Sequence, residues 1–343
     1  MRLGVLTGGG DAPGLNAVIR GIVIKANQLG YSVTGFLSGW RSMLDGKSIP
    51  LGLEDVETIV RKGGTILGTS RTNLAKIENG MEKAKVTLKS KNIDCLIAIG
   101  GEDTLGVAAK LFKSGVNTIG VPKTIDNDLE STDYTFGFDT AINIAMECLD
   151  RLHTTAESHH RVMVVELMGR HAGWIALEAG IAGDAHIILI PEQKFDVDEI
   201  CNMIQKRVDS GKTYTIIAVS EGALPKSLDQ NLTKDNEVDS FGHIKLGGIA
   251  EWLAKQIEQK TKQETRHTVL GHIQRGGAPS AFDRVLGTRM GLKAVALAEE
   301  KKFGQMVSLR GTELFSVSLE EGVKKLKTVS EERYAEARIL MGK

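Results

Sequence analysis

The chain has 343 residues, which is enough for two domains with separate hydrophobic cores. Its 43 basic and 43 acidic residues cancel, which argues against a broad nucleic-acid or acidic-membrane surface. No apolar run reaches about 18 residues and the N-terminus carries no secretory pattern, so we expect a cytoplasmic protein without a membrane span. The cysteines Cys95, Cys148 and Cys201 are widely spaced in apolar segments, as core thiols of a cytosolic protein are.

Short apolar strands alternate with amphipathic helices along the whole chain. In chain order the expected elements are strand Leu3–Leu6, helix Leu15–Leu29, strands Ser32–Phe36 and Cys95–Ile99, helix Val107–Ser114, strand Thr118–Val121, helix Thr140–Leu152, strand Val162–Leu167, helix Ile175–Ile181, strand Ile187–Ile190, helix Val197–Val208, strand Thr215–Val219, helix Ile249–Gln263, strand Thr268–Leu270 and helix Val285–Glu299. This alternation predicts an α/β fold of two Rossmann-like three-layer lobes, with mainly parallel sheets and a cleft between the lobes.

The division between the lobes is a soft boundary near Gly137–Asp139, because no linker or repeat interrupts the chain. We expect one lobe to comprise residues 1–138 and about 251–305. The other is expected to comprise residues 139–250 and about 306–343.

The residues that could bind a ligand or take part in catalysis follow strands. GGGDAPG comes after LGVL, GGEDT after CLIAI, PKTIDND after TIGV, MGR after VVEL and SEG after IIAV. Ligands of parallel α/β sheets bind at the carboxyl ends of the strands, so these segments are expected to meet at one site.

The glycine-rich segment Gly8–Gly10 with Asp11 and Gly14 lies between a strand and a helix, where backbone N–H groups and a helix N-terminus attract anions. The plain alternative is a tight strand-to-helix turn. A dinucleotide loop does not fit, because the spacing is G-x-G-x-x-x-G and no acid ends the second strand. The Walker-like Ser210–Thr213 precedes a strand and has Lys206 at its first glycine position, so we discard it.

Four carboxylates follow two neighbouring strands: Glu102 and Asp103, then Asp126 and Asp128. Solvated loop acids are the alternative for any one of them. As a cluster they would repel strongly unless a cation lay among them. Magnesium prefers one or two carboxylates together with phosphate oxygens, so the cluster indicates phosphoryl transfer.

Basic residues complete this set. Lys123 directly precedes the second acidic segment, and arginines lie at strand edges or in glycine-rich turns, at Arg71, Arg161, Arg170, Arg266 and Arg275. Arginine forks commonly hold phosphate monoesters, and Arg or Lys neutralises a phosphoryl group in transfer.

At this point the sequence resembles the phosphofructokinase family in its short, bacterial-type form. The matching stretches are GGGDAPGLNAVIRG, GGTILGTSR, IGGEDT, PKTIDND, TDYTFGFDTA, SHHRVMVVELMGRHAGWIAL, ETRHTVLGHIQRGG and PSAFDR, which cover nearly the whole chain in order. The resemblance implies that the first lobe binds the phosphoryl donor, the second lobe binds a sugar phosphate, and the reaction takes place in the cleft.

Roles follow from the resemblance by position. Asp126 would be the general base for the sugar C1 hydroxyl, Thr124 would position the reacting group, and Arg71 and Arg170 would neutralise the moving phosphoryl group. The residues implied for fructose 6-phosphate are Thr124, Asp126, Asp128, Arg161, Met168, Gly169, Arg170, Glu221, Arg266, His272 and Arg275. Arg161 and Arg266 would reach in from a neighbouring subunit, which implies a homo-oligomer, either a dimer or a tetramer.

The phosphoryl donor is predicted from two positions. The resemblance implies that Gly9, Gly10, Asp103, Thr104 and Lys123 bind the donor. ATP-using relatives resemble GGDGS and PGTIDND at the two loops, whereas pyrophosphate-using relatives carry an Asp and a Lys where this chain has Asp103 and Lys123. Glu102 and Asp128 would associate with Mg²⁺, with Glu102 in place of the usual Asp.

We therefore expect reversible, Mg²⁺-dependent transfer from pyrophosphate to fructose 6-phosphate, giving fructose 1,6-bisphosphate and phosphate in glycolysis or gluconeogenesis. The main alternative is an ATP-dependent enzyme of the same fold. Lipid and NAD kinases share a Gly-Gly-acid-Gly element but lack TIDND and HIQRGG. A non-catalytic metabolite-binding regulator would have lost the base, yet Asp126 is present.

The first prediction concerns regulation. Short ATP-dependent relatives bind effectors at a subunit-interface pocket rich in basic side chains, and the matching region here keeps Arg20 and Lys212 but has Ile24, Ser210 and Tyr214 where cations are expected. Fewer cations make a weaker anion site. We expect hyperbolic sugar-phosphate kinetics with little response to ADP or phosphoenolpyruvate. A steady-state titration that gave a Hill coefficient well above one, or strong inhibition by millimolar phosphoenolpyruvate, would contradict this.

Overall fold

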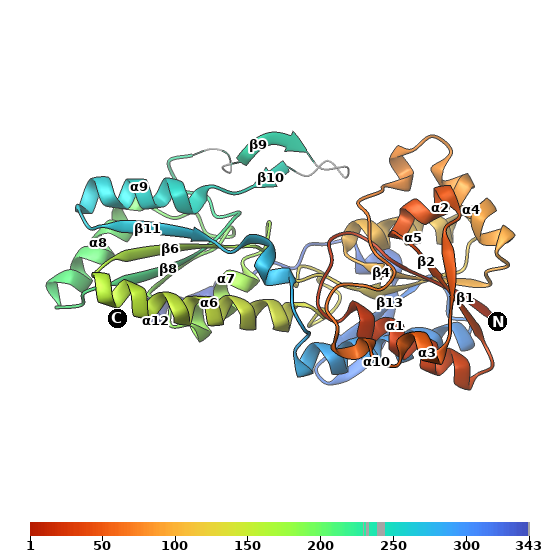
Figure 1. The fold of residues 1–343 in the computed structure, drawn as a ribbon. Helices are drawn as coiled ribbons and strands as arrows, with labels where there is room; N and C mark the ends of the chain where they lie inside the picture. The colour runs from red at the N-terminus through yellow and green to blue at the C-terminus, as the bar shows by residue number, and fades with distance from the viewer. Residues whose placement is uncertain (229, 231–232, 239–243, 342–343) are drawn as a thin grey trace.

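The computed structural model describes residues 1–228, 230, 233–238 and 244–341, which form two lobes (Figure 1). The first lobe is built on a seven-stranded sheet in the order β13-β12-β5-β4-β1-β2-β3. Its strands are β1 (Arg2–Thr7), β2 (Ser32–Phe36), β3 (Ser48–Leu51), β4 (Cys95–Gly100), β5 (Thr118–Pro122), β12 (Gln305–Arg310) and β13 (Glu313–Ser318). The central strands are parallel, and only the outer pairs β2–β3 and β12–β13 are antiparallel.

Side chains of this sheet alternate between two helical layers, as the twofold periodicity of a strand requires. Leu3 and Val5 pack in the core formed with α1 and α10, whereas Leu6 packs in the core formed with α4 and α5. These helices are α1 (Leu15–Gln28), α4 (Gly80–Ser90), α5 (Glu102–Lys113) and α10 (Ala281–Glu299). The short helices α2 (Ser42–Asp45), α3 (Leu53–Val56) and α11 (Leu319–Gly322) lie in the same lobe.

The second lobe is built on a four-stranded sheet in the order β11-β6-β8-β7, in which all pairs are parallel. Its strands are β6 (Val162–Leu167), β7 (Ile187–Leu189), β8 (Thr215–Ser220) and β11 (Thr265–Val269). The helices α6 (Phe138–His159), α7 (Trp174–Ala182) and α12 (Glu331–Leu340) cover one face, and α8 (Val197–Asp209) and α9 (Ile249–Thr261) cover the other. An antiparallel pair, β9 (Thr233–Val238) and β10 (Ile244–Leu246), lies beside this lobe.

The predicted fold class is confirmed, since both lobes are α/β layers with mainly parallel sheets. The predicted lobe ranges differ from the sheets and are corrected here. Strand β11 and helix α9, within the range 251–305, belong to the second lobe, and strands β12 and β13, within the range 306–343, belong to the first. The reason is pairing between strands far apart in the chain. β11 pairs with β6 and β12 pairs with β5, and a local sequence pattern does not show with which strand another one pairs.

Several element boundaries also differ from the expected ones. Helix α5 begins at Glu102 rather than Val107, α10 begins at Ala281 rather than Val285, and β11 begins at Thr265 rather than Thr268. Three strands of the first sheet were not expected from the sequence: β3 and β13, which are its two edges, and β12, which lies next to β13. The two edge strands β3 and β13 are partly exposed, so they lack the continuous apolar runs that marked the central strands.

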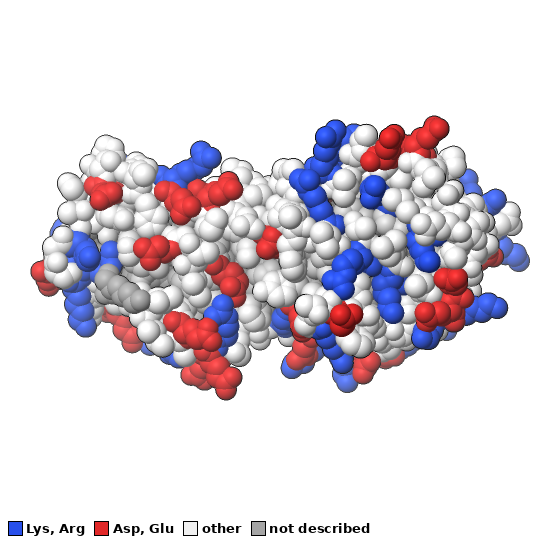
Figure 2. All heavy atoms as spheres, turned by 90° about the horizontal axis from the view of Figure 1, so that it is seen from below, with Lys and Arg blue, Asp and Glu red and all other residues white. Residues whose placement is uncertain are grey.

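The surface carries both signs of charge. Figure 2 shows acidic and basic side chains interspersed over the face that it presents, in keeping with the zero formal net charge of the chain. Among the residues that the structure describes, no helix combines the length and the apolar character needed to cross a membrane.

The lobes are joined at a buried aspartate of α10. Asp283 is fully buried, and its Oδ2 accepts hydrogen bonds from the backbone N–H of Thr140 (2.8 Å) and from the Thr140 hydroxyl (2.5 Å). Thr140 lies in the first turn of α6, and its hydroxyl oxygen also accepts from the N–H of Ser280 at 2.9 Å. The start of α10 in the first lobe is thereby bound to the start of α6 in the second.

The second prediction concerns this aspartate. Burial raises the pKa of Asp283 to about 6, against the lowering effect of the Thr140 hydrogen bonds. Between about pH 4 and 6 the folded chain keeps a proton that the unfolded chain has lost, so the free energy of unfolding falls as pH rises through this window. The expected fall is about 3 kcal/mol, with no further change above pH 6 from this group.

Urea unfolding between pH 4.5 and 7 measures this slope. We expect Asp283→Asn to lose it, because the amide does not titrate. Asp209→Asn is the control, since Asp209 is an exposed aspartate in α8. Equal pH dependence in wild type and Asp283→Asn would contradict the assignment.

Candidate active site

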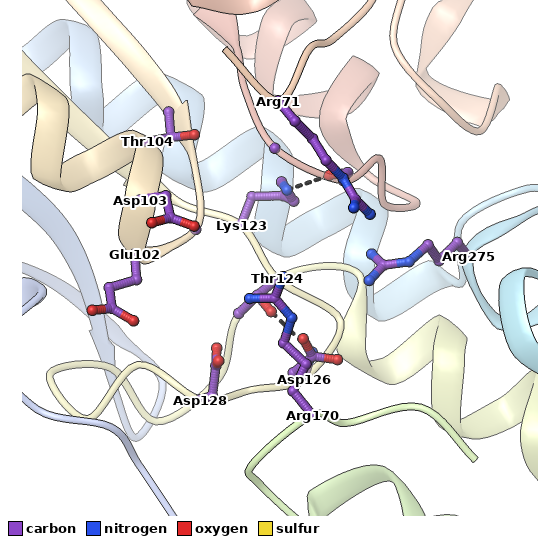
Figure 3. A pocket seen from close by; sticks show the side chains of 13 residues that line it. Arg71, Glu102, Asp103, Thr104, Lys123, Thr124, Asp126, Asp128, Arg170 and Arg275 are labelled. Carbon is purple, nitrogen blue, oxygen red and sulfur yellow. Dashed lines mark hydrogen bonds between the residues drawn. The ribbon is translucent and has the colours of Figure 1, made fainter. Parts of the chain in front are cut away.

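A polar pocket lies where the carboxyl ends of the first-lobe strands face the second lobe (Figure 3). Its lining comes from six separate segments of the chain, and the residues are Gly9, Gly10, Arg71, Gly101, Glu102, Asp103, Thr104, Lys123, Thr124, Asp126, Asp128, Arg170 and Arg275. Most of the residues predicted from the sequence are therefore brought together in one place.

The glycines around the pocket are required by close packing against α5. A Cβ atom at Gly8 would lie 2.5 Å from the Thr104 hydroxyl oxygen, and one at Gly100 would lie 2.4 Å from Thr104 Cβ. The N–H of Gly8 donates to the carbonyl of Ile99 (2.9 Å) and that of Gly9 donates to Ser70 (3.2 Å). These two N–H groups are thus already used within the protein.

The helix N-terminus that faces the pocket is that of α5, whereas the sequence had pointed to α1. Gly101 caps α5, and Glu102 and Asp103 form its first turn. Carboxylates are stabilised at this position by the partial positive charge of the helix N-terminus. This explains how two adjacent acids are tolerated at the mouth of an anion site.

Lys123 is the buried cation of the pocket, with 3% of its surface exposed at the end of β5. Its ammonium group donates a hydrogen bond to the carbonyl oxygen of Gly10 (Figure 3). Burial, followed by the Arg275 guanidinium, lowers the pKa of Lys123 to about 7, while the carboxylates of Asp126, Asp11 and Asp128 oppose this. A phosphate in the pocket would favour the charged form of the lysine.

Two carboxylates, Asp126 and Asp128, face the pocket from the loop after β5. Asp126 is 6% exposed and its Oδ1 is buried without a hydrogen-bond partner in the described structure. The N–H of Asp126 donates to the Thr124 hydroxyl oxygen (3.0 Å), which shapes the loop. Burial and the neighbouring Asp126 raise the pKa of Asp128 to about 7. The pocket therefore holds two carboxyl groups that can bind a proton or a cation.

Arg170 enters the pocket from the second lobe, after β6. Its N–H donates to Glu221 Oε1 (3.1 Å), and a Cβ at Gly222 would lie 1.9 Å from the Arg170 carbonyl oxygen. Burial and Asp126 raise the pKa of Glu221 to about 7. Gly169, with φ of 141°, precedes Arg170, and Met168 packs partly into the core. Glu221, Gly169 and Met168 thus lie behind Arg170 and outside the lining of the main pocket.

A second hollow adjoins the first, and the two share Gly9, Gly10, Arg71 and Arg275. His272 lines this second hollow and not the main pocket. The Arg275 guanidinium donates to the carbonyl oxygen of Asp11 (3.1 Å), which fixes it beside the glycine loop. Arg71 and Arg275 therefore stand between the two hollows.

The sequence analysis missed Thr69 and Ser70, which line the second hollow and support the glycine loop. The Thr69 hydroxyl donates to the Gly9 carbonyl (2.6 Å), and the Ser70 carbonyl accepts from the Gly9 N–H. Both residues directly precede Arg71 in the segment GTSR, so their nearness to this predicted arginine was the signal that could have found them.

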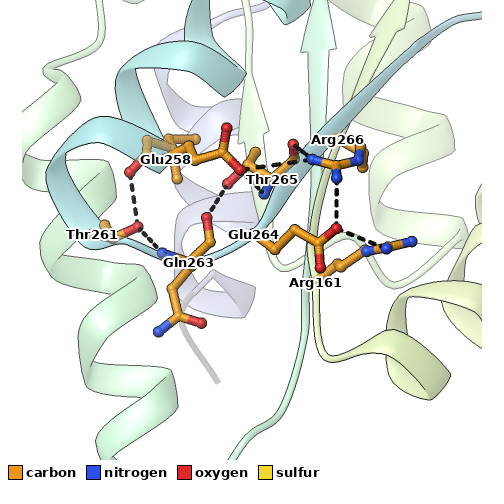
Figure 4. Close-up of polar contacts among 8 residues, drawn as sticks. Arg161, Glu258, Thr261, Gln263, Glu264, Thr265 and Arg266 are labelled. Carbon is orange, nitrogen blue, oxygen red and sulfur yellow. Dashed lines mark hydrogen bonds and ion pairs between the residues drawn. The ribbon is translucent and has the colours of Figure 1, made fainter.

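Arg161 and Arg266 are not brought to the pocket. Arg161 precedes β6, whereas Arg170 follows it, and the six residues of the strand separate its two ends by about 20 Å. Arg161 and Arg266 instead share the carboxylate of Glu264, at 2.7 and 2.6 Å (Figure 4). They form a paired basic group at the other end of the second sheet.

The residues that match the effector pocket of ATP-dependent relatives lie in two different lobes of one chain. Arg20 and Ile24 lie on α1 in the first lobe, whereas Ser210, Lys212 and Tyr214 follow α8 in the second. The Tyr214 ring packs against two histidines, and its centroid lies 5.7 Å from that of His153 and 5.4 Å from that of His186. An aromatic group thus occupies part of this region.

For a metal ion, the described residues contain no group of three or more His, Cys, Asp or Glu arranged to hold one. Glu102 and Asp128 nevertheless line the same pocket, where burial and the neighbouring Asp126 raise the pKa of Asp128 to about 7. One or two carboxylates with phosphate oxygens are the usual surroundings of magnesium. The donor set therefore fits an ion that binds together with a phosphate substrate.

A two-lobed α/β fold with carboxylates and phosphate-binding cations at the strand ends defines a phosphoryl-transfer type of protein. The family model "Phosphofructokinase" matches residues 2–298. A pyrophosphate–fructose 6-phosphate 1-phosphotransferase of Amycolatopsis methanolica is 57% identical over 344 residues, and an ATP-dependent 6-phosphofructokinase of Corynebacterium efficiens is 49% identical. These alignments cover 100% of this chain and 100% and 99% of the two relatives.

A solved structure of Saccharomyces cerevisiae phosphofructokinase superposes with a TM-score of 0.82 at 30% identity, covering 99% of this chain and 46% of that one. The chain therefore belongs to the phosphofructokinase family, and the predicted resemblance is confirmed.

Proposed function

We propose that this protein transfers a phosphoryl group from pyrophosphate to the C1 hydroxyl of fructose 6-phosphate, giving fructose 1,6-bisphosphate and phosphate. The observation that carries the choice of donor is that Asp103 and Lys123 both line the pocket. The Amycolatopsis relative is named as a pyrophosphate-dependent enzyme, which supports the same choice. The alternative donor is ATP, which the name of the Corynebacterium relative keeps open.

The reaction needs positioning and charge neutralisation more than a strong base. The unpartnered Oδ1 of Asp126 accepts the proton of the C1 hydroxyl while the hydroxyl oxygen attacks a phosphorus atom of pyrophosphate. The bond from this phosphorus to the bridging oxygen breaks and phosphate leaves. Arg71, Arg170 and Lys123 offset the negative charge of the group in transfer, and Thr124 holds the loop of the base.

Glu102 and Asp128 are the proposed Mg²⁺ ligands, and the ion would neutralise phosphate oxygens of the donor. Glu221, His272 and Arg275 are proposed to bind the sugar phosphate beside Arg170, with Met168 and Gly169 shaping that end of the site. We propose that the reaction is reversible, because phosphate can take the phosphoryl group back from the C1 ester.

We also propose a homo-oligomer in which Arg161 and Arg266 complete the site of a neighbouring copy. Their position at the far end of the second sheet from Arg170 supports this arrangement. A cytoplasmic location is consistent with three free thiols, Cys95, Cys148 and Cys201.

The third prediction is the donor preference. In this fold ATP would place its α-phosphate over residue 103, where the Asp103 carboxylate fills the space. Two unit charges about 4 Å apart repel by about 4 kcal/mol at an effective dielectric constant near 20, which is roughly a thousandfold in affinity. We expect kcat/KM for pyrophosphate to exceed that for ATP at least a hundredfold, in coupled assays at equal magnesium.

Two variants test the reason for this preference. Asp103→Gly is expected to raise the use of ATP, and Lys123→Gly is expected mainly to reduce the use of pyrophosphate. The two changes should couple in a double-mutant cycle, because both residues address one phosphate. A wild-type preference for ATP would overturn the proposed donor, and unchanged ATP use in Asp103→Gly would overturn the explanation.

The fourth prediction concerns the base. Asp126→Asn keeps the shape of the side chain but cannot accept the proton, so kcat should fall roughly a hundredfold or more with little change in KM for the sugar phosphate. Steady-state kinetics with both substrates measure this. Near-normal turnover by the variant would exclude Asp126 as the base.

A further inference from the structure

Lys327 lies outside the pocket, in the segment 323–330 that leads from α11 in the first lobe to α12 in the second. Its backbone N–H donates to the carbonyl oxygen of Asp128 (2.8 Å). Its ammonium group donates to the carbonyl oxygens of Thr132 (3.2 Å) and Asp133 (2.5 Å). One residue thereby holds both the acidic loop of the site and the segment that follows it.

The same residue is bound on its other side by Trp174. The indole N–H of Trp174 donates to the Lys327 carbonyl oxygen (3.0 Å), and the Lys327 ammonium lies 5.3 Å from the Trp174 ring centroid and 5.9 Å from that of Tyr134. Such distances are those of a cation–π interaction. Trp174 is the first residue of α7, four residues after Arg170.

Glu192 provides a second link between the same two segments. Its Oε1 accepts hydrogen bonds from the N–H of Gly173 (2.9 Å) and from the N–H of Val329 (2.9 Å). The segment 323–330 is therefore attached at two points to the loop that carries Arg170.

The two loops need such support. Asn127 and Arg170 both have φ of 52°, in the left-handed region. Asparagine adopts this conformation readily, whereas for Arg170 it is uncommon and has to be held by its surroundings. One loop presents Asp126 and Asp128 from the first lobe, and the other presents Arg170 from the second.

We propose that Lys327 is a positioning residue, which sets the placement of the Asp126 loop relative to the Arg170 loop for phosphoryl transfer. The inference rests on the proposed function. Lys327 does not line the pocket, so it acts through these loops and not on a substrate. A displacement of reacting groups by about 1 Å can cost a hundredfold in rate, so loss of this link should appear in kcat.

Lys327→Met tests the proposal by removing the ammonium group while keeping the length of the side chain. We expect kcat with pyrophosphate to fall at least tenfold, with KM for either substrate changed less than threefold. Lys327→Arg can still donate to both carbonyls and lie over the Trp174 ring, and is expected to recover most of the activity.

The matched control is Lys325→Met. Lys325 lies two residues away and pairs with Glu130 of the same loop, but its side chain is 71% exposed. We expect kcat within twofold of wild type, because an exposed pair holds little. An equal loss in both lysine variants, a normal kcat in Lys327→Met, or no recovery in Lys327→Arg at unchanged melting temperature would overturn the proposal.

If Lys327→Met does not fold, Trp174→Phe decides the question. This variant keeps an aromatic ring under the ammonium but loses the N–H that donates to Lys327. We expect a threefold to tenfold lower kcat with unchanged KM, and an unchanged kcat would overturn the proposal. A wild-type enzyme inactive with both pyrophosphate and ATP would instead overturn the proposed function, and the inference with it.

Discussion

The site depends on the buried ammonium of Lys123. It donates to the carbonyl of Gly10 and lies among the carboxylates of Asp11, Asp126 and Asp128, so the glycine loop and the acidic loop converge on one cation. Burial lowers its pKa to about 7, while the carboxylates favour the charged form. This balance makes the pocket responsive to an added anion, since a phosphate would strengthen the charged state of the lysine.

The remaining groups come from both sides of this centre. The first turn of α5 supplies Glu102 and Asp103, and the second lobe supplies Arg170. Because phosphoryl transfer relies on positioned charges, the placement of one lobe against the other is part of the chemistry. Contacts outside the pocket lining, such as Asp283 with Thr140 and Lys327 with Trp174, connect the two lobes.

The arginines divide into two groups that lie in different parts of the molecule. Arg71, Arg170 and Arg275 line one pocket, whereas Arg161 and Arg266 share Glu264 at the opposite end of the second sheet. The carboxylate of Glu264 pairs with both Arg161 and Arg266 and offsets part of their positive charge (Figure 4). This division is the observation from which we propose that a neighbouring copy supplies Arg161 and Arg266.

The sequence by itself determined the fold class and most of the pocket, because the residues after parallel strands must meet at one edge of a sheet. It did not reveal that α5 begins at Glu102, since a glycine cap and two acids resemble a loop. Only the tertiary structure shows to which lobe β11 and β12 belong and which segments Lys327 connects. Periodicity records which face and which end of a strand a residue occupies, whereas pairing between segments far apart in the chain leaves no local pattern.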